Sequence, residues 1–201
     1  MKYAVYSPMR TGSMAIIGLL QQFYPQLQKM EVYDGCSAIV PNTVLHTHDL
    51  EQYLAWTRKL PRTNRIISIR NPRESLVSLL YQEVTQVSHI WDDQPPRPPV
   101  ATYIPNPRRL LVDLYDQLIS AYFQLAQRDL SQHLVIDYCQ FSQDPDGLLP
   151  PLLGIDQALP SRCIWIKSIR NPGGPAEWFT NWEEISAIVD SFPPVVGYVT
   201  P

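Results

Sequence analysis

Short apolar segments alternate with helical patterns along most of this chain of 201 residues. Each apolar segment is only a few residues long and ends at polar or turn-forming residues, which is typical of strands, and the longer segments repeat their apolar residues at helical spacing. The predicted strands are Lys2–Ser7, Thr43–Leu45, Arg65–Ile69, His133–Tyr138 and Cys163–Ile169. The predicted helices are Met14–Phe23, Leu50–Leu60, one opened by Asn71 and Pro72, Leu110–Leu130, a weak one from Asp144 to Gly154, and Ala176–Val189.

This alternation predicts a parallel sheet, because neighbouring parallel strands need a crossover connection and the crossover helices then cover both faces. We therefore expect one domain over residues 1–201, of the α/β class, with a central, mostly parallel sheet flanked by helices. Ligands of such sheets bind at the carboxyl ends of the strands. The residues that follow each predicted strand are thus the first candidates for function.

Composition narrows the possible partners. Hydrophobic residues make up 45% and charged residues 17% of the chain, as in a packed globular protein. The net charge of −3 gives no general attraction to nucleic acid or to an anionic membrane, so we expect neither as a partner. No apolar stretch approaches the roughly 20 residues that cross a bilayer. Lys2 begins a strand pattern where a secretory signal would need a long apolar segment, so we expect a cytoplasmic protein.

The turn after the first predicted strand carries the first candidate site. It reads Ser-Pro-Met-Arg-Thr-Gly-Ser-Met over Ser7–Met14. Backbone N–H groups at a helix start, a glycine that permits close approach and two hydroxyls form an anion cradle, to which Arg10 adds a charged donor. The loop lacks the Gly-x-x-x-x-Gly-Lys-[Ser/Thr] pattern of ATP- and GTP-binding loops, which disfavours an ordinary NTPase. A purely structural turn is the alternative.

The second candidate site follows the third predicted strand. Arg70 ends that strand, and Ser78 lies eight residues later in the next helix. The run Arg-Asn-Pro-Arg-Glu-Ser-Leu-Val-Ser-Leu-Leu-Tyr from Arg70 to Tyr81 resembles the 3'-phosphate-binding motif of sulfotransferases that use 3'-phosphoadenosine 5'-phosphosulfate, PAPS. The resemblance implies a three-layer P-loop-type fold in which Arg70 and Ser78 hold the 3'-phosphate. It also implies that the first loop binds the 5'-phosphosulfate, through Arg10, Thr11, Gly12, Ser13 and Met14.

A pair of histidines follows the second predicted strand, in the sequence Leu-His-Thr-His-Asp-Leu. This segment resembles the Lys-Thr-His-Leu-Pro segment of cytosolic sulfotransferases, and the resemblance implies that His48 is the catalytic base. An imidazole suits that role because its pKa lies near neutrality. His46 and His48 would point to the same face of a strand, so a zinc site is conceivable. No third ligand with suitable spacing appears, and we expect no metal; a structural histidine is the other alternative.

Two weaker matches extend the resemblance. The segment Val-Ile-Asp-Tyr places Tyr138 where the family has a tyrosine that lines the adenine pocket, although a core tyrosine would give the same pattern. The tail segment with Arg170, Trp178 and Asn181 resembles a late family segment whose arginine closes over the 3'-phosphate. The chain departs from the family at Ala15, where many members carry a tryptophan, at Cys139, where an acidic residue is common, and at His46 and Arg10, which replace lysines.

The resemblance implies a PAPS-dependent sulfotransferase that acts on a hydroxyl or amine of a small-molecule or glycan acceptor and needs no metal. Arg10 would offset charge on the leaving phosphate, and His48 would deprotonate the acceptor. A proline-dense loop at Trp91–Pro107 is a candidate lining of the acceptor pocket, and a rigid surface connection is the alternative. The alternatives are a noncatalytic, sulfotransferase-like nucleotide-binding protein, and a P-loop kinase or phosphotransferase that would need Mg²⁺ and ATP.

Overall fold

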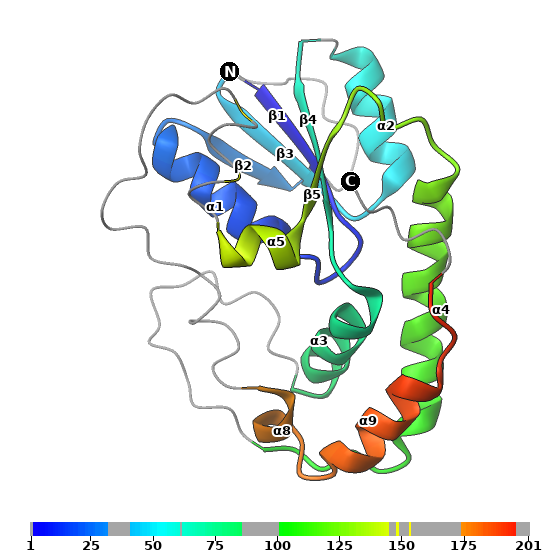
Figure 1. Ribbon diagram of the computed structural model, residues 1–201. Coiled ribbons are helices and arrows are strands. Elements are labelled where there is room, and N and C mark those ends of the chain that lie inside the picture. The colour runs from blue at the N-terminus through cyan, green and yellow to red at the C-terminus, as the bar shows by residue number, and fades with distance from the viewer. Residues whose placement is uncertain are drawn as a thin grey trace.

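A parallel sheet forms the centre of the protein (Figure 1). The computed structural model describes residues 2–31, 41–60, 62–85, 101–144, 148, 153 and 174–195. Within these residues the sheet has five strands in the order β2-β3-β1-β4-β5, and every pair of neighbours is parallel. The strands are β1 (Lys2–Tyr6), β2 (Gln28–Glu31), β3 (Thr43–Thr47), β4 (Asn64–Ile69) and β5 (Leu134–Asp137). The predicted α/β class, with a parallel sheet flanked by helices, is confirmed.

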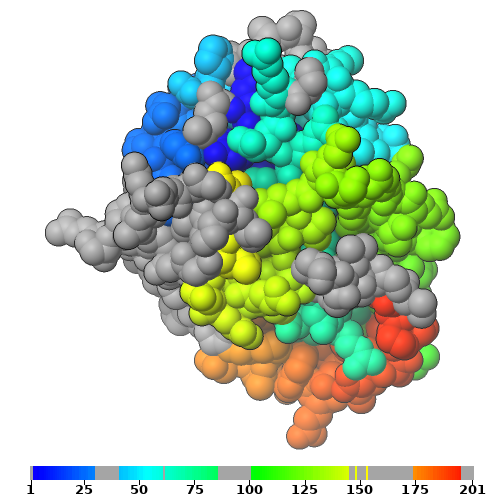
Figure 2. All heavy atoms as spheres, turned by 45° about the horizontal axis from the view of Figure 1, so that its top comes forward, coloured from blue at the N-terminus to red at the C-terminus, as the bar shows by residue number. Residues whose placement is uncertain are grey.

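Helices pack on both faces of this sheet and against one another (Figure 1). The helices of the described residues are α1 (Ser13–Phe23), α2 (Leu50–Lys59), α3 (Pro72–Thr85), α4 (Pro107–Ala126), α5 (Tyr138–Gln143), α8 (Pro175–Trp178) and α9 (Trp182–Ser191). The side chains of β1 alternate between two cores: Tyr3 and Val5 pack with α1 and α5, whereas Ala4 and Tyr6 pack with α2, α3, α4 and α9. Figure 2 shows α1 in blue on one side of the surface and α2 and α4, in cyan and green, on the opposite side.

The strand order brings three loops together at one edge of the sheet. β1 lies between β3 and β4, which belong to the two halves of the sheet, and the direction of winding reverses there. The register pairs Tyr6 with both Thr47 and Ile67, so the carboxyl ends of these strands are nearly level. The segments that begin at Ser7, His48 and Arg70 therefore emerge beside one another, at the place where open α/β sheets bind ligands.

Several elements differ from the sequence-based predictions. The edge strand β2 and the short helix α5 were not predicted. The predicted helix Ala176–Val189 is two helices, because the chain between them pairs with a distant segment: Thr102 N donates to Trp178 O at 2.9 Å and Thr180 N donates to Thr102 O at 3.1 Å. The predicted strand Cys163–Ile169, and the part of the proline-dense loop before residue 101, lie outside the described residues.

α4 begins at Pro107, three residues before its predicted start, and ends at Ala126, four residues before its predicted end. Proline is favoured in the first turn of a helix, where its missing N–H is not needed.

Even this 20-residue helix is not apolar enough for a bilayer, and the described residues contain no helix able to span a membrane.

Candidate functional site

The loop between β1 and α1 presents an uncapped helix start. Gly12 is the N-cap of α1 and has a φ of 81°, and Arg10 also lies in the left-handed region, with a φ of 62°. Within the described part of the chain, no side-chain hydrogen bond caps the helix, and its first turn holds no acidic residue. The first N–H groups of a helix have no partner within the helix and lie at the positive end of its dipole. Such a helix start suits an anion.

Gly12 also makes room for Tyr138. A Cβ atom at Gly12 would lie 1.9 Å from Tyr138 Cδ2, closer than any contact between nonbonded atoms. Tyr138 is the first residue of α5 and is 8% exposed, and its ring therefore packs directly on the backbone of the loop. The Tyr138 ring thus lies between the Ser7–Met14 loop and the Arg70 side chain at the end of β4, and it borders the candidate site.

Two buried hydroxyls hold the loop in place. Thr11 Oγ1 lies 2.8 Å from Pro8 O and 3.0 Å from Ser68 O, and shares its single proton between these two carbonyls. In return, Ser68 Oγ donates to Thr11 O. Both residues are fully buried. The Thr11 hydroxyl is thus occupied inside the loop, and only the backbone N–H of Thr11 remains as a donor toward a ligand.

The two candidate anion sites meet through their side chains. Arg10 Nε donates a hydrogen bond of 2.9 Å to Ser78 Oγ, on the second turn of α3. Arg70 Nη1 donates to the backbone oxygen of Arg10 at 3.4 Å. Ser78 is buried, whereas the Arg70 side chain is 21% exposed. Residues 68 positions apart in the sequence therefore form one cluster of guanidinium and hydroxyl donors.

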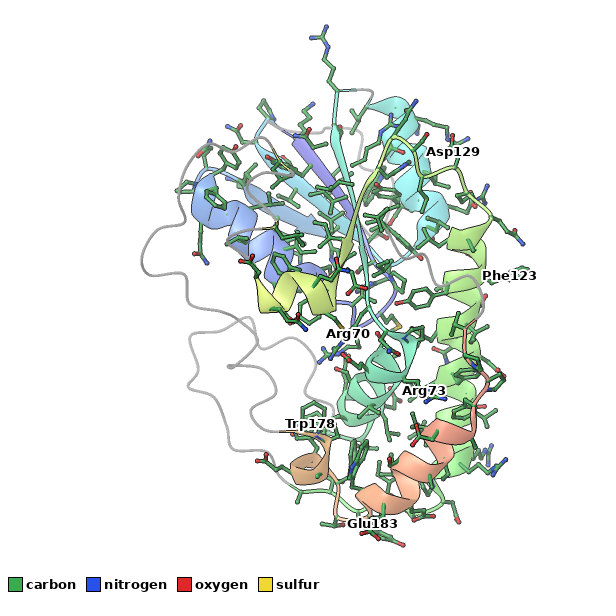
Figure 3. The ribbon with its side chains drawn as sticks, viewed as in Figure 1. Arg70, Arg73, Phe123, Asp129, Trp178 and Glu183 are labelled. Atoms are coloured by element: carbon green, nitrogen blue, oxygen red, sulfur yellow. The ribbon has the colours of Figure 1, made fainter. Side chains whose placement is uncertain are left out.

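Arg70 is held from several sides at this edge of the sheet (Figure 3). Its Nε donates to Glu74 Oε2 at 3.0 Å, and its guanidinium carbon lies 5.3 Å from the centre of the Tyr138 ring. The Tyr122 hydroxyl, from α4, accepts from Arg70 N at 3.1 Å and donates to Arg70 O. The backbone at the end of β4 is thus fixed, and the guanidinium lies between an aromatic face and a half-exposed carboxylate.

Cys139 contacts the same carboxylate. Its Sγ lies 3.4 Å from Glu74 Oε2. Burial, followed by the nearby charge of Glu74, raises the pKa of the Cys139 thiol. The thiol therefore stays protonated and donates to Glu74, so that the carboxylate stays fixed beside Arg70.

His48 lies at the adjoining end of β3, and its ring nitrogen points back toward the loop. The ring is exposed, and its Nδ1 lies 2.8 Å from Ser7 O and 3.2 Å from Ser7 Oγ. A carbonyl oxygen can only accept, so Nδ1 must carry a proton. In the neutral ring, Nε2 then carries no proton and is the basic atom. This tautomer is assigned from the hydrogen bond.

His46 is buried behind His48. The two ring centroids lie 4.8 Å apart at an interplanar angle of 82°, and His46 Nε2 lies 3.5 Å from Ser7 Oγ. His46 is 5% exposed. Nitrogen atoms of both histidines thus face Ser7. Among the described residues, no group of three or more His, Cys, Asp or Glu side chains could hold a metal.

Most of the predicted site residues gather at this edge of the sheet. Around the loop and its neighbours lie Arg10, Thr11, Gly12, Ser13, Met14, Arg70, Ser78 and Tyr138. His48 joins them through Ser7, and Arg170 lies outside the described residues. Ser7 lay within the predicted loop but had no assigned role, and Tyr122 was not predicted as part of the site. Ser7 had a signal, since it is the first residue after a strand, whereas Tyr122 lies in a long helix with nothing to distinguish it.

The fold and the site define an α/β protein with an uncapped helix start where the winding of its sheet reverses. No protein-family model and no curated protein matches this sequence. Among solved structures, the chain is similar to the sulfotransferase domain of the olefin synthase from Synechococcus PCC 7002, at 13% sequence identity and a TM-score of 0.49. The match covers 100% of this chain and 96% of that domain's chain. The likeness is one of fold.

Proposed function

We propose that the protein binds PAPS and transfers its sulfuryl group to a hydroxyl or amine of a small-molecule or glycan acceptor. The observation that carries the proposal is the 2.9 Å hydrogen bond between Arg10 and Ser78, which joins the loop after β1 to α3. A nucleotide with a 5'- and a 3'-phosphate carries both groups on one ribose, so its two phosphate sites must be neighbours. The contacts of Arg10 with Ser78 and Arg70 meet that requirement.

The donor set suits such a nucleotide. The backbone N–H groups of Thr11 to Met14, with the Ser13 hydroxyl, would hold the 5'-phosphate at the positive end of α1. Arg70 and Ser78 would hold the 3'-phosphate, with Arg170 closing over it. Tyr138 packs against both Gly12 and Arg70, and would border the adenosine between the two phosphates. A 3'-phosphate would compete with Glu74 for the guanidinium of Arg70.

The chemistry follows from three groups. PAPS, when bound, supplies the sulfuryl group, with the 5'-phosphate as its leaving group. His48 Nε2 would take the proton from the acceptor hydroxyl, and the Ser7 carbonyl would stabilise the resulting imidazolium by accepting from Nδ1–H. Arg10 would offset negative charge on the 5'-phosphate.

Replacing Arg70 tests the nucleotide site. In Arg70→Ala, we expect the affinity for adenosine 3',5'-bisphosphate, measured by isothermal titration calorimetry, to fall about tenfold to a hundredfold, because one charge-assisted hydrogen bond is typically worth about 1.5–3 kcal/mol. Arg73→Ala is the matched control: this arginine lies three residues after Arg70, in the first turn of α3, and pairs with Asp190 at 3.1 Å, away from the loop. Equal affinity in wild type and Arg70→Ala would reject the assignment.

Replacing His48 tests the transfer itself. Sulfate transfer from PAPS to a panel of hydroxyl and amine acceptors should be about a hundredfold to ten-thousandfold slower in His48→Ala, with unchanged affinity for the bisphosphate, because a general base contributes that much to the rate. Binding of the bisphosphate without transfer would identify a noncatalytic nucleotide-binding protein. Stabilisation by ATP with Mg²⁺, and none by the bisphosphate, would identify a phosphotransferase.

A further inference from the structure

The Ser7 hydroxyl lies between two histidines, and the proposed mechanism gives no role to this hydroxyl or to His46. Its hydroxyl oxygen is 3.2 Å from His48 Nδ1 and 3.5 Å from His46 Nε2. Ser7 is fully buried and continues the pairing of β1 with β3, since its N–H donates to Thr47 O at 3.3 Å. Its position between the rings is therefore set by the sheet.

The protons of this triad can be assigned from its donors and acceptors. His48 Nδ1 carries a proton because it faces the Ser7 carbonyl at 2.8 Å. The Ser7 hydroxyl has a single proton, and a protonated Nδ1 cannot accept it. His46 Nε2 is the other nitrogen within reach, so the hydroxyl donates to His46 and turns its lone pairs toward His48.

We propose that His46 is a positioning residue for His48 and acts through the Ser7 hydroxyl. By accepting the hydroxyl proton, His46 keeps Ser7 from donating to His48 Nδ1. A Ser7 hydroxyl that turned toward His48 would favour the opposite tautomer, in which Nε2 carries the proton and cannot act as a base. This inference rests on the proposed function, in which His48 Nε2 is the base.

This hydrogen-bond arrangement predicts how substitutions of His46 change the rate of sulfate transfer. His46→Leu keeps much of the volume of the side chain and removes the acceptor, so the Ser7 hydroxyl turns to His48. We expect kcat for sulfate transfer to fall about twofold to tenfold, the range that one net hydrogen bond covers. KM for PAPS should not change. His46→Gln retains an acceptor and should stay near wild type.

The double variant Ser7→Ala/His46→Leu separates this mechanism from a structural role. Removing the hydroxyl leaves the Ser7 backbone carbonyl in place to hold the Nδ1 proton, so the double variant should recover most of the activity that His46→Leu loses. Nitrogen-15 NMR of the His48 ring gives a readout besides activity. We expect one tautomer, with Nε2 unprotonated, in wild type and in the double variant, and a mixture in His46→Leu.

Each outcome decides the proposal. A single His48 tautomer in His46→Leu, or a double variant no more active than His46→Leu, would overturn it. If wild type transferred no sulfate, the proposed function would fail, and the NMR spectra would still show whether His46 sets the tautomer of His48. Should His46→Leu not fold, Ser7→Ala alone must keep the wild-type tautomer, and a mixture there would contradict the assignment.

Discussion

Gly12 meets two physical demands at a single residue. Its φ of 81° lies in a region that residues with a Cβ adopt at a cost, and the place of that Cβ is taken by the Tyr138 ring. Gly12→Ala should therefore lower the free energy of unfolding by about 2–5 kcal/mol, the sum of the left-handed backbone cost and the overpacking cost. Urea denaturation measures this change.

Gly174→Ala is the matched control for that variant. A Cβ at Gly174 meets no atom within 4 Å, and the residue has a φ of −106°. Its unfolding free energy should stay within about 0.5 kcal/mol of wild type, as for most surface substitutions. If Gly12→Ala were as stable as Gly174→Ala, the tight packing of Tyr138 on the loop would be wrong.

The types of the site residues were predictable from the sequence, but their partners were not. Arg10, Gly12 and Arg70 were predicted as site residues because each follows a strand. The bond between the Thr11 hydroxyl and Ser68 joins residues 57 positions apart, and the bond between Arg70 and Tyr122 spans 52. Such contacts depend on how the strands and helices pack, and no local pattern carries them.

At the scale of whole elements, burial decided what could be predicted. The strands β1, β3 and β4 are mostly buried on both faces and read as apolar runs in the sequence. β2 is an edge strand of sequence Gln-Lys-Met-Glu, pairs only with β3 within the described sheet, and shows neither an apolar run nor a clear alternation.

The start of α5 shows a different limit on predicting structure from the sequence. Asp137, the last residue of β5, is also the N-cap of α5, and its carboxylate accepts from Cys139 N at 2.7 Å. No turn separates the strand from the helix, so the apolar pattern of β5 appeared to continue to Tyr138. The same abrupt change of direction brings the Tyr138 ring against Gly12. A short capped helix thus sets part of the wall of the candidate site.

Across the whole molecule, the parallel sheet separates the candidate site from a second cluster of polar groups. The candidate site occupies the carboxyl ends of the strands, whereas His133 immediately precedes the amino end of β5. The His133 ring lies 5.7 Å from the ring of Tyr53, which is fully buried. Neither His133 ring nitrogen nor the Tyr53 hydroxyl finds a hydrogen-bond partner among the described residues. Such groups cost stability, most of all when charged.

This cluster should make the stability of the whole protein depend on pH. Burial, and then the charge of Arg65, lower the pKa of His133 below its ordinary 6.5, against a smaller opposing effect of Asp129. The unfolded chain therefore binds a proton more readily than the folded protein, so the stabilising effect of neutral His133 is complete above about pH 6.5 and is lost as the pH falls toward the lower folded-state pKa.

Comparison with His133→Gln isolates this effect, because glutamine stays neutral and the other three histidines are the same in both proteins. Unfolding free energies from urea denaturation between pH 7.5 and pH 5 should fall more steeply with acidification in wild type than in His133→Gln. The difference should begin near the ordinary histidine pKa, about 6.5. Parallel curves would mean that His133 accepts its proton as easily in the folded protein as in the unfolded chain, which its burial beside Arg65 and Tyr53 opposes.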